Sequence, residues 1–186
     1  MAKTLKAIAL DVEYAIVNND TKVQGTSNVA GKMGGIPHFV NATTLPNNVI
    51  DAGGALTEEK LNDAVQAAWK KGGTPDICVV SGKNKRAISA FSDQERRRSA
   101  DATKLKKVID VYESDFGLVN MVLHRMQADS RIDLLQSEYW KLAYLIPFKT
   151  YDKPKDSLVN GKVVTGQLTL ECRSPEANSA ITGITN

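Results

Sequence analysis

The 186-residue sequence has few of the residues from which reactive sites are usually built. It contains two histidines, His38 and His124, and two cysteines, Cys78 and Cys172. None of the four belongs to a CxxC, HExxH or calcium-loop spacing, so we expect neither a metal nor another cofactor. Both cysteines lie in apolar, strand-like segments, which favours buried free thiols over a disulfide.

Motifs of the common catalytic sites are also missing. The sequence has no GxSxG elbow and no SxxK, and its glycines form neither GxGxxG nor a phosphate-binding P-loop. Asp110, Glu113 and Asp115 lie around a predicted hairpin, where exposed turn acids are far more common than a catalytic carboxylate pair. The sequence therefore predicts a protein that is not an enzyme.

Long hydrophobic runs are absent as well. A stretch such as Leu142 to Ile146 is far shorter than the ~18 apolar residues of a membrane-spanning helix. Near the N-terminus, Asp11 and Glu13 interrupt the pattern of a secretory signal peptide. We therefore expect neither membrane insertion nor an oxidising compartment.

The residues that are present describe an ordinary globular protein. Apolar residues make up 42% and charged residues 24% of the chain, and 24 Lys and Arg against 21 Asp and Glu give a net charge of +3. This excess is too small to indicate nucleic-acid binding on its own. The length suits one domain, or two small lobes that share a core.

Apolar spacing predicts two helices in the first 75 residues. One covers residues 3–18, and the other covers 58–71, with Thr57 as N-cap, Gly72 at its end and a buried stripe of Leu61, Ala64, Val65, Ala68 and Trp69. Between them, residues 20–55 are rich in Gly, Asn and Thr and read as one long loop.

The rest of the chain alternates between strand and helix patterns. Strands are expected at 76–80, 132–135, 142–148 and 164–173, a hairpin at 108–113 and 118–124, and a helix from Ser81 to Phe91. This order indicates a mixed α/β, or α+β, fold.

A basic segment runs from Lys83 to Lys107. It holds nine Lys or Arg, including Arg96, Arg97 and Arg98, and three acids, so its net charge is +6. Such a segment either contacts phosphates or forms a solvated loop. No aromatic residue lies between Arg96 and Lys107, so a platform for stacking bases is not indicated.

Five segments together resemble the major capsid protein family of tailed phages, which has the Hong Kong 97-type fold. They are ALDVEYAIVNN (9–19), NVIDAGGALTEEKLNDAVQAAWKKGGTPDICVVSGKNKRAIS (48–89), VIDVYESDFGLVNMVLHR (108–125), EYWKLAYLIPFKT (138–150) and GQLTLECRSPEANSAITG (166–183). These are packing and turn patterns rather than catalytic signatures, and they agree in order over nearly the whole chain.

The resemblance implies three parts. Residues 1–55 would hold the end of the peripheral-domain spine helix and a glycine-rich loop, residues 56–141 the axial domain with its sheet flanked by helices, and residues 142–186 the returning peripheral strands and the C-terminus. Compared with that family, the sequence is expected to lack the N-terminal arm and the extended loop that precede the spine helix.

The function implied by the resemblance is structural. The chain would be a capsid subunit, or its core, of a DNA-enclosing phage head, found in the virion and assembled in the host cytoplasm. Its partners would be further copies of itself, with scaffold or decoration proteins and weakly bound DNA as additional candidates. A nanocompartment shell that encloses a cargo enzyme, and a small α/β enzyme, are the alternatives.

Two groups of residues are candidates for these contacts. Arg96, Arg97 and Arg98 would face acids of a neighbouring subunit or packaged DNA. Gly31, Gly34, Gly35 and His38 would belong to a loop that reaches toward neighbouring subunits.

Overall fold

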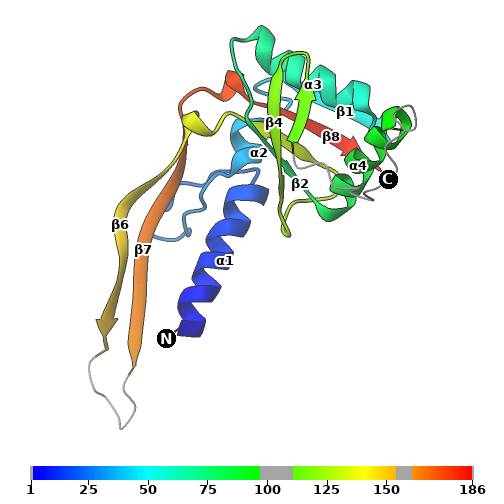
Figure 1. Ribbon diagram of the computed structural model, residues 1–186. Helices are drawn as coiled ribbons and strands as arrows, with labels where there is room; N and C mark the ends of the chain where they lie inside the picture. The colour runs from blue at the N-terminus through cyan, green and yellow to red at the C-terminus, as the bar shows by residue number, and fades with distance from the viewer. Residues whose placement is uncertain (1, 97–110, 154–160, 186) are drawn as a thin grey trace.

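A long two-stranded arm projects from a body that is built around a six-stranded sheet, and helix α1 (Ala2–Asn18) lies beside the arm (Figure 1). The computed structural model describes residues 2–96, 111–153 and 161–185. In the view of Figure 1 the arm and α1 extend from the same side of the body.

The body sheet has the order β1-β8-β5-β2-β4-β3. β1 pairs with β8 and β2 with β4 in parallel, whereas the remaining neighbours are antiparallel. This mixed sheet, flanked by helices, confirms the predicted α+β class. The strands are β1 (Val49–Gly54), β2 (Ile77–Val80), β3 (Val111–Ser114), β4 (Gly117–Leu123), β5 (Ile132–Leu135) and β8 (Ser179–Ile184).

Two helices supply apolar side chains to the main core. α3 (Glu58–Lys70) begins as predicted, because the Thr57 hydroxyl accepts a hydrogen bond from the Lys60 backbone N–H. α4 (Gly82–Arg96) begins after Ser81, whose hydroxyl accepts one from the Asn84 N–H. Leu61 of α3 and Ile88 of α4 are fully buried in one cluster with side chains of β2, β4, β5 and β8.

Trp69 does not belong to this core, so the prediction that it is buried is wrong. Its side chain is 52% exposed, and its ring lies against Phe116 with the centroids 5.4 Å apart. At about 100° per residue, Trp69 is turned by roughly 80° from Leu61 around the helix. It therefore lies at the edge of the apolar stripe rather than on its centre.

A second, smaller core covers part of the opposite sheet face. β2 alternates between the two cores, with Cys78 and Val80 in the first and Ile77 and Val79 in the second. The second core also includes Ile36, the first residue of the short helix α2 (Ile36–Phe39), together with Ile16 near the end of α1. The end of α1 is thereby fixed to the body.

The arm consists of β6 (Trp140–Asp152) and β7 (Lys162–Cys172), paired antiparallel. β6 is longer at both ends than the predicted strand at 142–148. β7 shows the predicted alternation of more and less exposed residues. The short 3-10 turns η1 (Ser137–Tyr139) and η2 (Pro175–Ala177) connect the two strands to the body.

Two strands, one short helix and the end of another helix were missed by the sequence patterns. Residues 20–55 are not one loop, because they contain α2 and the edge strand β1, in which a register shift and two positive-φ glycines, Gly53 and Gly54, hide the strand period. β8 was also missed, because no strand was predicted after the one that ends before Ser174. α4 continues beyond Phe91, the predicted end of this helix, to Arg96.

Candidate intersubunit surface

The arm exposes an unusual amount of apolar surface. Leu145 is 80% exposed, and five further large apolar side chains of β6 are at least 40% exposed. Single soluble chains rarely expose such contiguous apolar patches unless another molecule covers them. We call this set the arm patch: Leu142, Tyr144, Leu145, Ile146, Phe148 and Tyr151.

The arm patch is exposed because the arm has no further layer. Within the described part of the chain, β6 and β7 pair only with each other, and an isolated pair of strands is marginally stable in water. The pairing of β6 with β7 has two register shifts, at Tyr144/Ile146 and at Ile146/Lys149, and Pro147 lies within the second, where a proline that cannot donate to the ladder is tolerated. Both faces of the arm therefore depend on other contacts.

A cleft of about 980 Å³ separates the arm from α1 and from residues 22–33. Its wall contains Tyr144, Leu145 and Phe148 of the arm patch and Val12 of α1. Gly166 on β7 lies so close to the Phe148 ring that a β-carbon there would collide with it. The cleft is open and mainly apolar, which suits a polypeptide surface better than a small polar ligand.

The glycine-rich segment lies along this cleft. The backbones of Val23 and Lys32 exchange two hydrogen bonds, of 3.0 and 2.9 Å, and form an isolated antiparallel bridge. Gly25 and Gly31 face each other next to this bridge, and a β-carbon on either would approach the other's backbone to 3.3 Å or less. Gly31 also lines the cleft.

The other predicted loop residues make contacts within the chain. Gly35 lies against the backbone carbonyls of Ala15 and Ile16 at the end of α1. Gly34 lies against the ring of His38, which borders a second hollow of about 590 Å³ near the root of the arm. Whether any of these residues also contacts a neighbouring subunit stays a prediction.

Replacing Gly35 by Ala should destabilise the protein, because the added β-carbon would overlap the Ala15 and Ile16 carbonyls. We expect a loss of about 1–3 kcal/mol, as for other overpacked sites, measured by urea denaturation. Gly82→Ala is the matched control, since a β-carbon there meets nothing within 4 Å. Equal stability of the two variants would contradict the close packing of Gly35.

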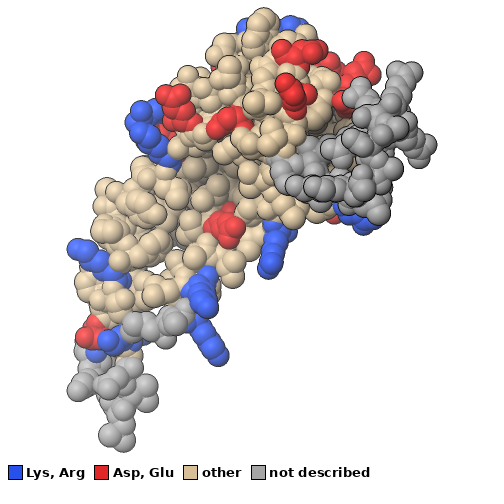
Figure 2. Space-filling model, in the orientation of Figure 1, with Lys and Arg blue, Asp and Glu red and all other residues tan. Residues whose placement is uncertain are grey.

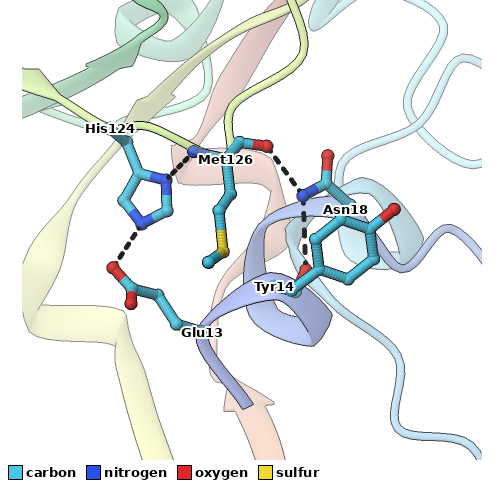
Figure 3. A network of polar contacts seen from close by, with 5 residues as sticks. All are labelled: Glu13, Tyr14, Asn18, His124 and Met126. Carbon is cyan, nitrogen blue, oxygen red and sulfur yellow. Dashed lines mark hydrogen bonds and ion pairs between the residues drawn. The ribbon is translucent and has the colours of Figure 1, made fainter. Parts of the chain in front are cut away.

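Polar contacts join α1 to the loop after β4 (Figure 3). His124 Nδ1 accepts a hydrogen bond of 3.2 Å from the Met126 N–H, so the neutral ring carries its proton on Nε2 and donates it to Glu13 Oε1 at 2.8 Å. Asn18 Nδ2 donates to the Met126 carbonyl at 2.8 Å. Together they hold the second half of α1 against the body.

The buried ionisable groups serve structure rather than catalysis. Asp133 is fully buried, which raises the pKa of its carboxyl, while Arg131 Nε at 2.7 Å and Gln127 Nε2 at 2.9 Å oppose that rise. Burial also raises the pKa of the Cys78 thiol well above its usual range and that of Cys172 to about 11. Neither thiol is thus activated as a nucleophile.

The described residues hold no cluster of metal-binding type. Among residues 2–96, 111–153 and 161–185, no three His, Cys, Asp or Glu side chains lie close enough together to hold an ion. Of the helices in these ranges, none has the length and apolar character that crossing a membrane requires.

Charge is distributed unevenly over the molecule. On the face shown in Figure 2, most acidic side chains lie over the body, whereas Lys and Arg outnumber acids over the arm and α1. Arg96 is the last residue of α4, and Arg97 and Arg98 lie outside the described residues. The predicted contact of these three arginines is therefore untested.

The arm patch was missed by the sequence analysis. The run LAYLIPF was interpreted only as a strand, and the exposure of its apolar side chains was not predicted. The sequence does contain a pattern that indicates the arm patch. Apolar residues occupy both faces of the run, whereas polar residues alternate with apolar ones in its partner strand β7.

The sequence matches a capsid protein family, and the fold matches the solved structures of an encapsulin and of a phage procapsid. The family model described as SU10 major capsid protein matches residues 1–185. The holo-SrpI encapsulin complex from Synechococcus elongatus PCC 7942 matches with a TM-score of 0.63 and 14% identity, and the satellite phage P4 procapsid including size determination (Sid) protein with 0.57 and 12%. Each match covers 98% of this chain and 64% of the other. No curated protein sequence matches.

Proposed function

Because the chain belongs to the SU10 major capsid protein family, we propose that it is a structural subunit that assembles with further copies of itself into the shell of a phage head. The predicted family resemblance and the Hong Kong 97-type fold are confirmed. The chain spans about two thirds of the length of the solved structures that it matches, so the composition of the whole shell is part of the proposal.

The arm patch is the observation that supports assembly most directly. Six large apolar side chains stay exposed on a strand that has one partner strand and no covering layer. Interfaces between like subunits are rich in such aromatic and aliphatic residues at their centre. Copies related by symmetry would cover one another's arm patches without any further protein.

The two sheets suggest that the chain has two domains. We propose that the six-stranded sheet with α3 and α4 is the axial domain, and that α1 and the arm form the peripheral domain. In this division β1 and β8 belong to the axial domain, although they lie outside residues 56–141. Contacts of Arg96, Arg97 and Arg98 with a neighbouring subunit or with packaged DNA, and binding of scaffold or decoration proteins, are finer parts of the same proposal.

Electron microscopy of the purified protein, combined with a mass measurement in solution, tests the function. Closed shells of uniform diameter are expected. If the purified protein stays monomeric even at concentrations well above those it reaches in the cells that express it, self-assembly is contradicted.

A nanocompartment shell is the second candidate, because the encapsulin structure also shares the fold. Analysis of the contents of shells purified from the native source separates the two. DNA inside supports the phage head, whereas a single packaged enzyme without DNA supports the nanocompartment.

A further inference from the structure

The arm leaves and re-enters the body through two short segments that meet at one side chain. Gln136 and η1 precede β6, and Arg173, Ser174 and η2 follow β7. Between them lies Asn178, whose exposed fraction is 0%. Apart from Leu170 of β7, which is buried in the second core near this junction, the two strands contact mainly each other among the described elements. The junction therefore contributes strongly to how the arm is held.

The amide of Asn178 bonds to both roots of the arm. Its Oδ1 accepts hydrogen bonds of 2.9 Å from the Gln136 N–H and from the Trp140 Nε1–H, both on the β6 side. Its Nδ2 donates a bond of 2.8 Å to the Ser174 carbonyl on the β7 side. Nδ2 also lies 3.5 Å from the Pro175 carbonyl and 3.9 Å from Cys172 Sγ. Donors therefore surround Oδ1 and acceptors surround Nδ2, so the orientation of the amide is fixed by its partners.

Asn178 is itself anchored in the body. Its carbonyl accepts a hydrogen bond of 2.8 Å from Asn48 Nδ2, which also donates to the Glu176 carbonyl at 2.7 Å. The Asn48 carbonyl in turn accepts from the Ala180 N–H of β8 at 3.0 Å. Asn48 is 1% exposed, so this polar cluster is enclosed by the fold.

We infer that Asn178 is a positioning residue that fixes the direction of the arm relative to the six-stranded sheet. A chain that merely needed a buried polar group there would not require bonds to both roots. Trp140 strengthens the arrangement, because its ring packs edge-to-face on Phe39 with the centroids 5.7 Å apart. The consequence for shell geometry rests on the proposed function, whereas the fixed direction of the arm does not.

Only an amide side chain can accept the two hydrogen bonds from the β6 side and donate one to the β7 side. Aspartate has the same shape but would turn a carboxylate oxygen toward the Ser174 carbonyl, and it would be buried. Alanine would leave the Gln136 N–H and the Trp140 Nε1–H without this acceptor, and the Ser174 carbonyl would keep only the 3.3 Å hydrogen bond from the Ala177 N–H.

Distance measurements by pulsed electron paramagnetic resonance test the inference. Spin labels on p-acetylphenylalanine at positions 63 and 149, in the body and in the arm, avoid the two native cysteines. Asn178→Asp should at least double the width of the label–label distance distribution. Asn84→Asp is the matched control, because Asn84 is an equally buried amide of α4 that bonds to the Asp129 carbonyl and is remote from the arm. It should leave the width unchanged.

A distribution for Asn178→Asp as narrow as that of the control would overturn the inference. Trp140→Phe covers the case in which Asn178→Asp does not fold, since it removes one donor to Oδ1 and keeps a ring against Phe39. It should widen the distribution by an intermediate amount, and an unchanged width would also overturn the inference.

To separate this inference from the proposed function, the shells formed by the Asn178→Asp variant are examined together with its distance distribution. A wide distance distribution with shells of mixed diameter supports both. A wide distribution with unchanged shells supports the positioning role and contradicts the role of the arm in assembly.

Discussion

Replacing Leu61 by Ala should lower the free energy of unfolding by about 2–5 kcal/mol, the range of leucine truncations in well-packed cores. Leu61 is completely buried in the main cluster, where α3 packs on the body sheet. The loss combines the lost burial of the side chain with the cavity that remains. Urea denaturation followed by circular dichroism measures the effect.

Trp69→Ala is the informative comparison on the same helix. Although tryptophan is the larger residue, its side chain is half exposed and packs mainly on Phe116. We expect a loss of about 1 kcal/mol or less, close to the range of surface substitutions. A larger loss for Trp69→Ala than for Leu61→Ala would contradict the orientation of α3 on the sheet.

This pair of residues illustrates how far the sequence predicts the fold. The cap at Thr57, the stripe around Leu61 and the period of β7 are local signals, and each was confirmed. Trp69 was misplaced because its spacing fits the edge of the stripe as well as its centre. Only the packing of neighbouring elements decides between the two.

Elements that depend on distant partners were harder to predict. β1 and β8 are short, contain glycine and pair with each other in parallel across more than a hundred residues, so neither shows a clear period of its own. Asn178 has the same difficulty, because its partners Gln136 and Trp140 are set by the tertiary fold. The capsid resemblance was predicted, but the arm patch was not.

Replacing Leu145 by Asp should abolish shell assembly while it changes the stability of the single subunit by no more than about 0.5 kcal/mol. Leu145 is the most exposed large apolar side chain among the described residues, so the subunit loses little when it changes. In a shell the same position would be enclosed, and a carboxylate enclosed without a partner is strongly unfavourable. Every copy would repeat this cost.

The control is Leu118→Asp on β4, which adds the same charge at a leucine that is 60% exposed on the body. If the arm patch is the main intersubunit surface, the Leu118→Asp variant should form more shells than the Leu145→Asp variant. Sedimentation velocity and electron microscopy report assembly, and denaturation of each monomer reports folding. Normal shells from Leu145→Asp would contradict burial of the arm patch between subunits. Another molecule would then have to cover this strand, because large apolar surfaces of this kind are rarely left exposed to solvent.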